Sequence, residues 1–447
     1  MNKLAKVVAG FVALAFVVAP AVPVSAADID VTADNIAEKL ESATTGDVLR
    51  LADGTYPASL KIDKSVTLTS ANKGAILQSV EVAADGVVLD GLSFTAPEGG
   101  GVNGVILSNA KGVKIINNVF TGNYKTAVTG SGVDASGLEI SGNNFDTTND
   151  ANRAHDVFIT TNGDGITVKN NNHFSAVVQI RGIDDSRPAK NVTYEGNTWD
   201  MKAHETAISV VSVDGLKINQ NRIKSTDTND QINGYGISLM GGVSNVAISD
   251  NTISGEVVGG IGLWQQPEYA GNTNSLITIS GNTIDDVRTS SIAVLGGNNG
   301  VVIENNTLSN SQYGVSVKSP MGLNGSVEIA GGNTIGNMSE AAIYVGENAV
   351  AEGEKVKVVT NTNTFTNNAA DIVAENDADI EKVEAEVPPT PETPEVTEPV
   401  EETPTNEADV TAPNTGETIA NFALVLTGVA VAVLTAVYAT RFASAKK

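Results

Sequence analysis

The stretch Val113-Lys114-Ile115-Ile116-Asn117-Asn118-Val119-Phe120 decides the fold, because versions of it recur along most of the 447-residue chain. Each copy has alternating apolar residues, then an asparagine, one variable residue and a large apolar residue. The copies end at Leu68, Phe94, Phe120, Phe145, Phe174, Trp199, Ile223, Ile253, Ile284, Leu308, Ile335 and Phe365. Their spacing is nearly even and lies within the period of about 20 to 50 residues that is typical of solenoids.

A second alternating strand lies within each period, for example Ala207-Ile208-Ser209-Val210-Val211. The strands are short, and the corners between them leave no room for crossover helices. We therefore predict an all-β fold, a parallel β-helix of about 12 coils. Asparagines near the corners would stack and hydrogen-bond along the axis. This predicted ladder comprises Asn118, Asn143, Asn172, Asn197, Asn221, Asn251, Asn282, Asn306, Asn333 and Asn363.

The β-helix is predicted to span residues 28–370, with a cap at its N-terminal end. An open solenoid end would expose unpaired backbone groups, which favours such a cap. Thr32 as the N-cap, followed by Ile36, Leu40 and Ala43 on one face, predicts a short amphipathic capping helix.

The N-terminal segment 1–27 has the pattern of a secretory signal peptide. Lys3 and Lys6 precede an apolar run, and small residues near Ala26 follow it. Cleavage near Ala26 is expected, and it would place the mature chain outside the cytoplasm.

Composition changes after the repeats, in the segment 371–411. Between residues 371 and 417 the chain has 15 acidic residues and a single lysine, and prolines are frequent. Like charges repel and proline favours extended geometry, so the segment is predicted to be an unfolded acidic spacer.

The C-terminal segment 412–447 combines Ala412-Pro413-Asn414-Thr415-Gly416, an uncharged apolar run at 419–440 and a basic tail. The run is long enough for a transmembrane helix. This order resembles the sorting signal of sortase-anchored surface proteins. The resemblance implies that a sortase cleaves between Thr415 and Gly416 and attaches the protein to the cell wall. A retained membrane anchor is the alternative, and both interpretations place the protein on the cell surface.

Composition also excludes several classes of function. The formal charge of −25 opposes a nucleic-acid partner, since phosphate binding needs basic residues. The absence of cysteine excludes disulfides, thiolate zinc sites and a cysteine nucleophile.

The segment Gly46-Asp47-Val48-Leu49-Arg50-Leu51-Ala52-Asp53-Gly54-Thr55-Tyr56 resembles the first coil of the pectate lyase-like superfamily. Together with the asparagine repeats, the resemblance covers about residues 33 to 370. It implies a right-handed β-helix, but not one activity, because members include polysaccharide lyases, glycoside hydrolases and surface proteins without known chemistry.

The residue that ends the second strand of each coil is predicted to face outward. This outward column comprises Thr160, Arg181, Val211, Met240, Trp264, Leu295 and Lys318. Its apolar members either lie under a loop or form a stripe on which a sugar or a partner can stack. Met240, Trp264 and Tyr269 are the predicted ligand contacts.

Polar residues near this column are candidates for catalysis. They are Lys169, Arg181, Asp184, Asp185, Arg187, His204 and Glu205. Lys169 followed by Ile180-Arg181-Gly182 resembles the alginate and chondroitin lyase branch, which implies a basic residue that removes a proton beside a uronate carboxylate. The order Asp184-Asp185, His204, Arg222-Ile223-Lys224 resembles polygalacturonase-type hydrolases instead. His155 beside Asp156 is interpreted as a surface pair.

Two oxygen-rich loops are weak candidates for calcium sites, and hydrated corners are the alternative interpretation. Their carboxylates are Asp146, Asp150, Asp227 and Asp230. No other cofactor is expected.

These observations favour a cell-surface β-helix that acts in binding or adhesion and recognises a polysaccharide or another surface. The alternative is a polysaccharide lyase or glycoside hydrolase acting on uronate-containing glycans. A purely structural spacer is the third hypothesis.

Overall fold

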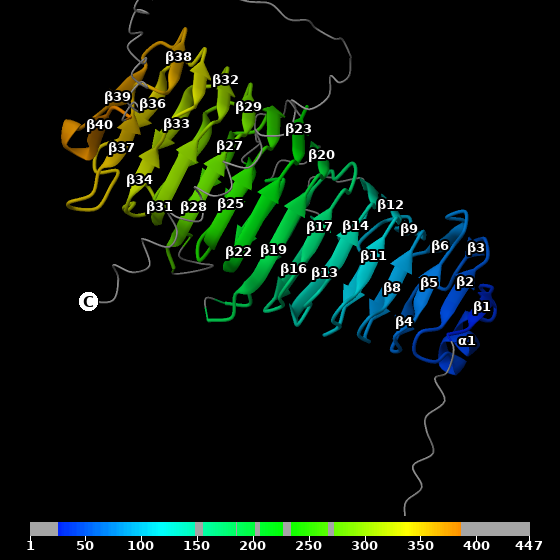
Figure 1. The fold of residues 1–447 in the computed structure, drawn as a ribbon. Coiled ribbons are helices and arrows are strands. Elements are labelled where there is room, and N and C mark those ends of the chain that lie inside the picture. Colours follow the sequence, from blue (N-terminus) through cyan, green and yellow to red (C-terminus); the bar gives the residue numbers. More distant parts are fainter. Residues whose placement is uncertain are drawn as a thin grey trace, which may run out of the picture. The chain divides into compact units, whose positions relative to one another are not determined.

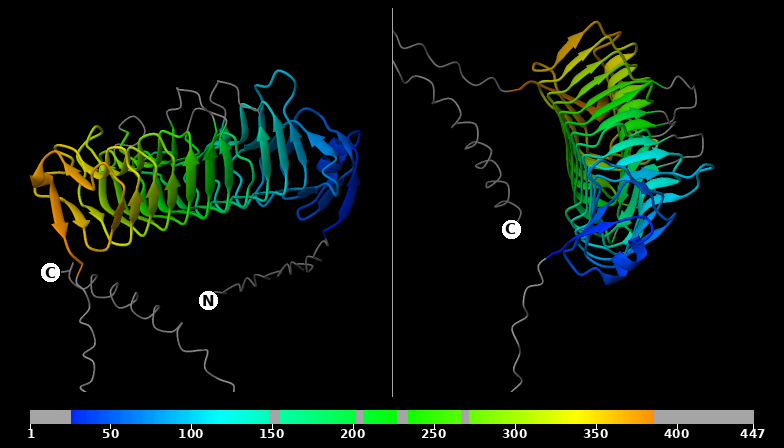
Figure 2. Two further views of the ribbon diagram at one scale, coloured as in Figure 1. Left: turned by 90° about the horizontal axis from the view of Figure 1, so that it is seen from above. Right: turned by 90° about the vertical axis from the view of Figure 1, so that its right-hand side faces the viewer.

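The computed structural model describes residues 26–147, 155–184, 186–201, 206–226, 234–266 and 272–385. These residues form an all-β parallel solenoid of about 12 turns, which confirms that part of the prediction. The turns stack into an elongated body, and the sequence advances along it from one end to the other (Figures 1 and 2).

The strands form four sheets, and every pairing between named strands in consecutive turns is parallel. The first sheet has 15 strands: β1 (Asp28–Val31), β2 (Val48–Leu51), β5 (Thr67–Thr69), β8 (Val88–Asp90), β11 (Lys114–Ile116), β14 (Glu139–Ser141), β17 (Thr167–Lys169), β19 (Ala189–Glu195), β22 (Val213–Asn219), β25 (Ser244–Ser249), β28 (Asn274–Ser280), β31 (Asn298–Glu304), β34 (Val327–Ile329), β37 (Val356–Val359) and β40 (Ile380–Val383).

The second sheet has 13 strands: β4 (Leu60–Ile62), β7 (Val80–Val82), β10 (Asn103–Leu107), β13 (Thr126–Val133), β16 (His155–Thr161), β18 (Val177–Arg181), β21 (Ile208–Val211), β24 (Tyr235–Leu239), β27 (Gly259–Leu263), β30 (Ser290–Val294), β33 (Tyr313–Val317), β36 (Ala341–Val345) and β39 (Ile372–Ala374).

The third sheet has five strands: β3 (Gly54–Thr55), β6 (Ala75–Leu77), β9 (Ser93–Thr95), β12 (Val119–Gly122) and β15 (Asn144–Thr147). The fourth has seven: β20 (Thr198–Met201), β23 (Arg222–Ser225), β26 (Thr252–Gly255), β29 (Thr283–Asp285), β32 (Thr307–Ser309), β35 (Thr334–Gly336) and β38 (Thr364–Thr366).

The third and fourth sheets meet at one irregular turn of the solenoid. Isolated bridges join Asn144 to Asn172 and Phe174 to Trp199 there. In this turn the ladder asparagine precedes the large apolar residue by three positions instead of two, and His173 has a positive φ of 57°. The extra residue interrupts regular strand pairing, and it separates the two sheets.

A ladder of buried asparagines runs along the corner between the first sheet and the third and fourth sheets, as predicted. In each step one carboxamide donates to the next, as from Asn118 Nδ2 to Asn143 Oδ1 (3.1 Å) and from Asn251 Nδ2 to Asn282 Oδ1 (2.9 Å). One predicted member was wrong: Asn171 is in the ladder, and Asn172 is exposed. The reason is the extra residue before Phe174, which displaces the ladder position by one.

A second, shorter ladder escaped the sequence analysis. Asn274 Nδ2 donates to Asn298 Oδ1 at 3.0 Å, and Asn298 Nδ2 donates to Asn324 Oδ1 at 2.9 Å. All three residues are buried, at the corner between the second and first sheets. This ladder therefore stabilises the C-terminal turns at a different corner.

Stacked side chains fill the interior of the solenoid. In the N-terminal turns they are aromatic: Phe94, Phe120, Phe145, Phe174 and Trp199 form one continuous stack with neighbouring ring centroids 4.4–4.8 Å apart. From Ile223 to Ile335 the same column is aliphatic, and Phe365 ends it.

Helix α1 (Ile36–Ser42) covers the N-terminal end, and Ile36 contributes to the core. The predicted N-cap was wrong. Asn35 occupies that position, and its side-chain oxygen accepts a hydrogen bond from the Thr32 backbone N–H at 2.8 Å. Thr32 therefore belongs to the turn before the helix, because the helix begins one turn later than predicted.

The solenoid extends beyond its predicted end at residue 370. Strand β39 pairs with β36, strand β40 pairs with β37, and the short 3-10 helix η1 (Asp377–Asp379) joins them. Residues 371–385 thus belong to the solenoid rather than to the acidic spacer. The apolar run Ile372-Val373-Ala374 forms β39, and Ile380 of β40 is buried, so the acidic residues around them did not prevent a last turn.

The other predicted segments lie outside the described residues. These are the signal peptide up to residue 25, the spacer from 386, the sorting sequence with Thr415 and Gly416, and the apolar run 419–440. Among the residues that are described, no helix has the length and apolar character needed to cross a bilayer.

Candidate functional site

The outer face of the second sheet has an unusual floor of small residues. Outward positions of five consecutive strands, in register, are Ser209, Ser238, Gly262, Ala293 and Ser316. Further toward the N-terminus the same row holds Phe158 and Gln179, and the next residue toward the C-terminus is Tyr344. Larger side chains therefore stand at both ends of this row, whose five small residues are themselves buried under neighbouring side chains.

Two aromatic rings lie on this row. Tyr235 of β24 and Trp264, directly after β27, have ring centroids 5.4 Å apart and planes inclined by 50°. A β-carbon added to Gly262 would lie 2.7 Å from the Trp264 ring and 2.9 Å from the Tyr235 ring. Glycine is therefore needed there, because both rings rest on the backbone. Both residues remain partly exposed, so they form an aromatic platform, defined here as Tyr235 and Trp264.

The predicted outward column adjoins the platform. The Trp264 N–H donates to the Leu239 carbonyl, the residue before Met240, at 2.9 Å, and the Lys318 N–H donates to the Val294 carbonyl at 2.8 Å. Met240, Trp264, Leu295 and Lys318 therefore follow one another on neighbouring strands, and all four are partly exposed. Val211 is buried, so the apolar stripe begins at Met240.

A second aromatic group lies further along the same face. Tyr313 and Tyr344 have ring centroids 4.9 Å apart, and the Lys318 ammonium lies 4.8 Å from each centroid. The Tyr344 hydroxyl donates to the Glu375 carboxylate, which also accepts the Glu347 backbone N–H at 2.9 Å. The bond to Glu375 raises the pKa of Tyr344 to about 12, and the same two donors lower the pKa of Glu375. Hydrogen bonds thus hold Tyr344 in place.

Among the catalytic candidates that the structure describes, Lys169 lies apart from Arg181, Asp184 and Arg187. Lys169 is on β17 of the first sheet, where its ammonium lies 3.3 Å from Glu139, whereas Arg181 ends β18 of the second sheet. Asp184 forms an ion pair with Arg187, which lowers the pKa of the Asp184 carboxyl. That carboxylate is therefore a poor proton acceptor at neutral pH.

The hydrolase-like motif is also divided. Arg222 and Lys224 are outward residues of β23 in the fourth sheet, and Ile223 between them belongs to the core. Asp185, His204 and Glu205 lie outside the described residues, as do Tyr269, Asp150, Asp227 and Asp230. Asp146 is exposed on β15, and the described part of the chain contains no group of three side chains suited to hold a metal.

The prediction of a surface pair at His155 and Asp156 was wrong for the aspartate. Asp156 is only 1% exposed and accepts hydrogen bonds from the Thr147 hydroxyl and from the backbone N–H groups of Ser175 and Ala176. Asp156 therefore links Thr147, at the end of the third sheet, to the backbone of Ser175 and Ala176 in the next turn.

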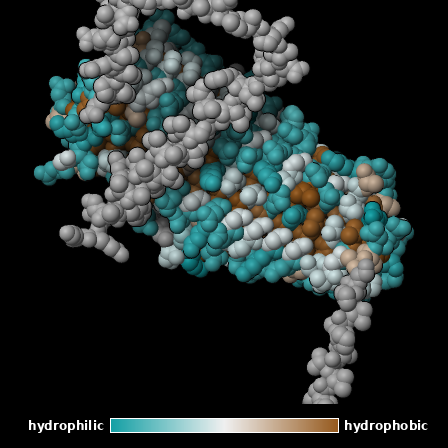
Figure 3. All heavy atoms as spheres, viewed as in Figure 1, coloured by the Kyte–Doolittle hydropathy of each residue, from teal (hydrophilic) through white to brown (hydrophobic). Residues whose placement is uncertain are grey.

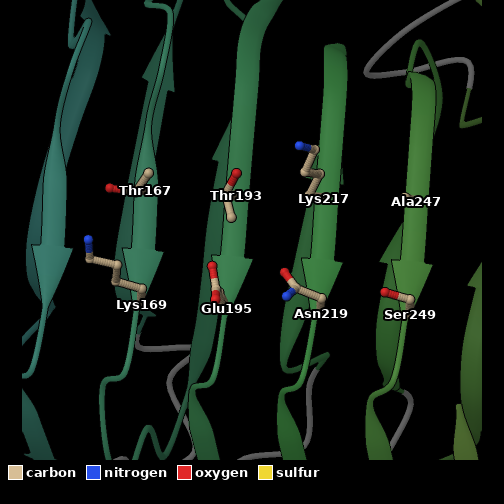
Figure 4. A pocket seen from close by; sticks show the side chains of 8 residues that line it. All are labelled: Thr167, Lys169, Thr193, Glu195, Lys217, Asn219, Ala247 and Ser249. Carbon is tan, nitrogen blue, oxygen red and sulfur yellow. The ribbon is translucent and has the colours of Figure 1, made fainter. Parts of the chain in front are cut away.

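A shallow polar depression lies on the outer face of the first sheet (Figure 4). Lys169, Glu195 and Lys217 line it together with hydroxyl groups from neighbouring strands, and it contains no aromatic ring. On the side of the molecule seen in Figure 3, hydrophilic residues dominate and hydrophobic patches are scattered. The depression is therefore a gap between solvated side chains, and the aromatic face of the second sheet is the stronger candidate site.

Comparisons with known proteins agree with the fold. A family model described as a protein of unknown function (DUF1565) matches residues 175–365, which contain both aromatic groups. A search of curated proteins found no match.

Several solved structures share this architecture at low identity. A mannuronic acid-specific family 6 polysaccharide lyase from human gut microbiota is 14% identical, with a TM-score of 0.56 over 79% of this chain and 92% of that one. The Dettilon tailspike protein is 15% identical (TM-score 0.48; 75% and 64%), and the surface adhesin PfbA of Streptococcus pneumoniae is 13% identical (TM-score 0.44; 76% and 86%). The likeness to the lyase concerns the fold alone.

Sequence reasoning placed Met240, Trp264 and Lys318 in the outward column but did not single out Tyr235, Tyr313 and Tyr344 on the same face. The signal was present, since Tyr235-Gly236-Ile237-Ser238-Leu239 and Tyr313-Gly314-Val315-Ser316-Val317 are two versions of one phrase. In both, the tyrosine begins the strand and is partly exposed, whereas the glycine after it faces the core, because a β-carbon added to Gly236 would meet Ile253 and one added to Gly314 would meet Ile335.

Proposed function

We propose that this protein is an exported, right-handed β-helix of the pectate lyase-like type that binds polysaccharide on the cell surface. The binding surface is the outer face of the second sheet between β24 and β36. Anchoring through the C-terminal segment would hold this face outside the cell, as an adhesion module requires.

The aromatic platform carries this proposal. Sugar rings present apolar C–H faces that stack on aromatic rings, and an aromatic side chain contributes a large contact area at a low entropic cost. Tyr235 and Trp264 stand over a floor in which Gly262 has no side chain to obstruct them. Stacking on such a surface needs no catalytic group.

The positions of the described candidate acid and base groups support binding over cleavage. A lyase or hydrolase needs its proton donor and acceptor within reach of one bond. Lys169 and Arg181 lie on different sheets, and Asp184 is bound to Arg187.

The test is retention of the purified protein on a panel of immobilised neutral and uronate-containing polysaccharides, with assay of the liquid phase for new reducing or unsaturated ends. We expect retention without cleavage, lost in Trp264→Ala and Tyr235→Ala. Leu276→Ala is the matched control, because Leu276 is 63% exposed on the first sheet, away from this face. Release of cleavage products would replace the adhesion proposal with an enzymatic one, and no retention on any polysaccharide would refute it.

A further inference from the structure

Exposed large apolar side chains gather at one corner of the described solenoid. Leu276 is 63% exposed, Met321 48% and Leu323 52%, and all three lie within three successive turns where the second sheet passes into the first. The Gly297 N–H donates to the Leu323 carbonyl at 3.2 Å, and a β-carbon added to Gly300 would lie 3.6 Å from the Leu276 side chain. We call Leu276, Met321 and Leu323 the apolar corner.

Leu276 combines this exposure with an unfavourable backbone conformation. Its φ is 54°, in the left-handed region that a bulky side chain rarely adopts. On the strands at either side, the equivalent places hold Asn245 (φ 54°) and Gly300 (φ 70°), which are residue types that tolerate this conformation. Asparagine or glycine would therefore suit the fold better than leucine. Strain and apolar exposure at one residue point to a contact outside the chain.

A depression on the outer face of the first sheet lies next to Leu276. It extends from β31 over β34 to the following turns, and β28 with Leu276 is the neighbouring strand (Figure 1). Its lining includes Gly300, Val302, Ser326 and Glu328. The Glu328 carboxylate is paired with the Lys357 ammonium at 3.0 Å. A protruding leucine and a shallow depression thus lie beside each other on one face.

The chain around the apolar corner carries almost no charge. Residues 289–327 contain only two charged side chains, Glu304 and Lys318, which have opposite signs, whereas the whole chain has a formal charge of −25. Two copies of so acidic a chain repel each other over most of their surfaces. A neutral face with apolar side chains is therefore the place where a second copy meets the least repulsion. Depletion of charge around an apolar centre is also typical of protein interfaces.

We propose that the apolar corner and the depression beside it bind a second copy of this chain. A two-fold symmetric pair uses one patch twice, so Leu276 of each copy enters the depression of the other. Met321 and Leu323 extend the apolar contact, and burial of these side chains offsets the strain at Leu276. The inference is independent of the proposed function, because it is centred on the first sheet and the aromatic platform lies on the second.

The experiment measures self-association of the purified full chain by sedimentation equilibrium over a range of protein concentrations. We expect a reversible dimer. Leu276→Asn should weaken it roughly 100-fold, because one substitution removes two buried leucines from a symmetric interface. The same variant should keep or raise the urea midpoint, since asparagine tolerates the positive φ. A purely structural role of Leu276 would lower that midpoint instead.

Leu323→Ser tests the second part of the corner and should also weaken the dimer. Ile76→Ser is the matched control, because Ile76 is 36% exposed, lies on β6 of the third sheet and should not affect association. A wild-type chain that stays monomeric at every concentration would overturn the inference. So would a dimer that Leu276→Asn leaves unchanged. Either result leaves the proposed function intact, because retention on polysaccharide is measured separately and depends on Tyr235 and Trp264.

Discussion

The two halves of the solenoid use aromatic residues in opposite places. In the N-terminal half they stack inside, where Phe94, Phe120 and Phe145 are fully buried. In the C-terminal half the interior column is aliphatic from Ile223 to Ile335, and Tyr235, Trp264, Tyr313 and Tyr344 stand outside. The same residue type therefore stabilises one half and, in our proposal, provides the binding surface of the other.

The two placements of the aromatic rings have different physical consequences. Where a stack of rings fills the interior, rings are held by neighbours above and below, and they are inaccessible to ligand. Where Ile and Leu fill it, aromatic rings are found on the outer face, and the small residues of that row are buried beneath their neighbours.

The largest loss of stability is expected when one ring is removed from the interior stack. Phe120→Ala leaves a cavity between Phe94 and Phe145 and should cost about 3–5 kcal/mol of unfolding free energy. Trp264→Ala, on the outer face, should cost much less. Urea-induced unfolding of both variants checks this, and a larger loss for Trp264→Ala would show that the outer rings are structural too.

The second largest loss of unfolding free energy is expected for the asparagine ladder, which extends through both halves of the solenoid. Asn251→Ala removes the acceptor of the Asn221 backbone N–H (3.0 Å) and side chain (3.0 Å) in a buried place. The expected loss is about 1–3 kcal/mol, the cost of leaving such groups unsatisfied. Asn172→Ala is the control, since Asn172 has the repeat spacing but is exposed; an equal loss there would contradict the ladder as described.

Gly262→Ala, in the C-terminal half, should change polysaccharide affinity through the placement of the two rings. The added methyl group displaces the Tyr235 and Trp264 rings, so polysaccharide affinity should fall roughly 10-fold, which corresponds to about 1.4 kcal/mol. Ala293→Gly, on the next strand of the same row, should leave the rings and the affinity unchanged. Affinity measurements on both variants decide whether ring placement matters.

The smallest effect is a pH dependence at the N-terminal end. Asp47 accepts hydrogen bonds from the Ala27 N–H and from the Thr44 N–H and hydroxyl, which lower its pKa. Its contribution is therefore present above the unfolded pKa, which is about 3.9, and is lost as the pH falls through the lower folded value. Asp47→Asn should reduce the acid sensitivity of the urea midpoint between about pH 5 and 3, relative to the exposed control Asp63→Asn. An unchanged acid sensitivity would contradict this role.

Most of the fold could be predicted because its information is local and repeated. Copies of Asn, variable residue and large apolar residue specify a corner followed by an inward side chain, and stacking the copies gives the parallel sheets. The errors occurred where one turn departs from the rule, as at Asn171 and Asn172, or where charge hid an alternating strand, as in 371–385.

The candidate site was less predictable because its residues belong to different turns. Trp264 could be placed on the outer face from its own strand, but its neighbour Tyr235 belongs to the preceding turn and becomes adjacent only when the two turns stack in register. Lys169 and Arg181 show the opposite case, because they are close together in the chain and yet lie on different sheets.

The sequence by itself determined the repeat, the parallel coil and the inward column, because alternation and spacing act within one turn. Only the tertiary structure decided which side chains meet across turns: the aromatic stack, the shifted ladder, the platform over Gly262 and the Lys318 ammonium between two tyrosines. Those contacts depend on the register between strands that are a full turn apart in the chain, and a shift by a single position would turn each side chain to the other face.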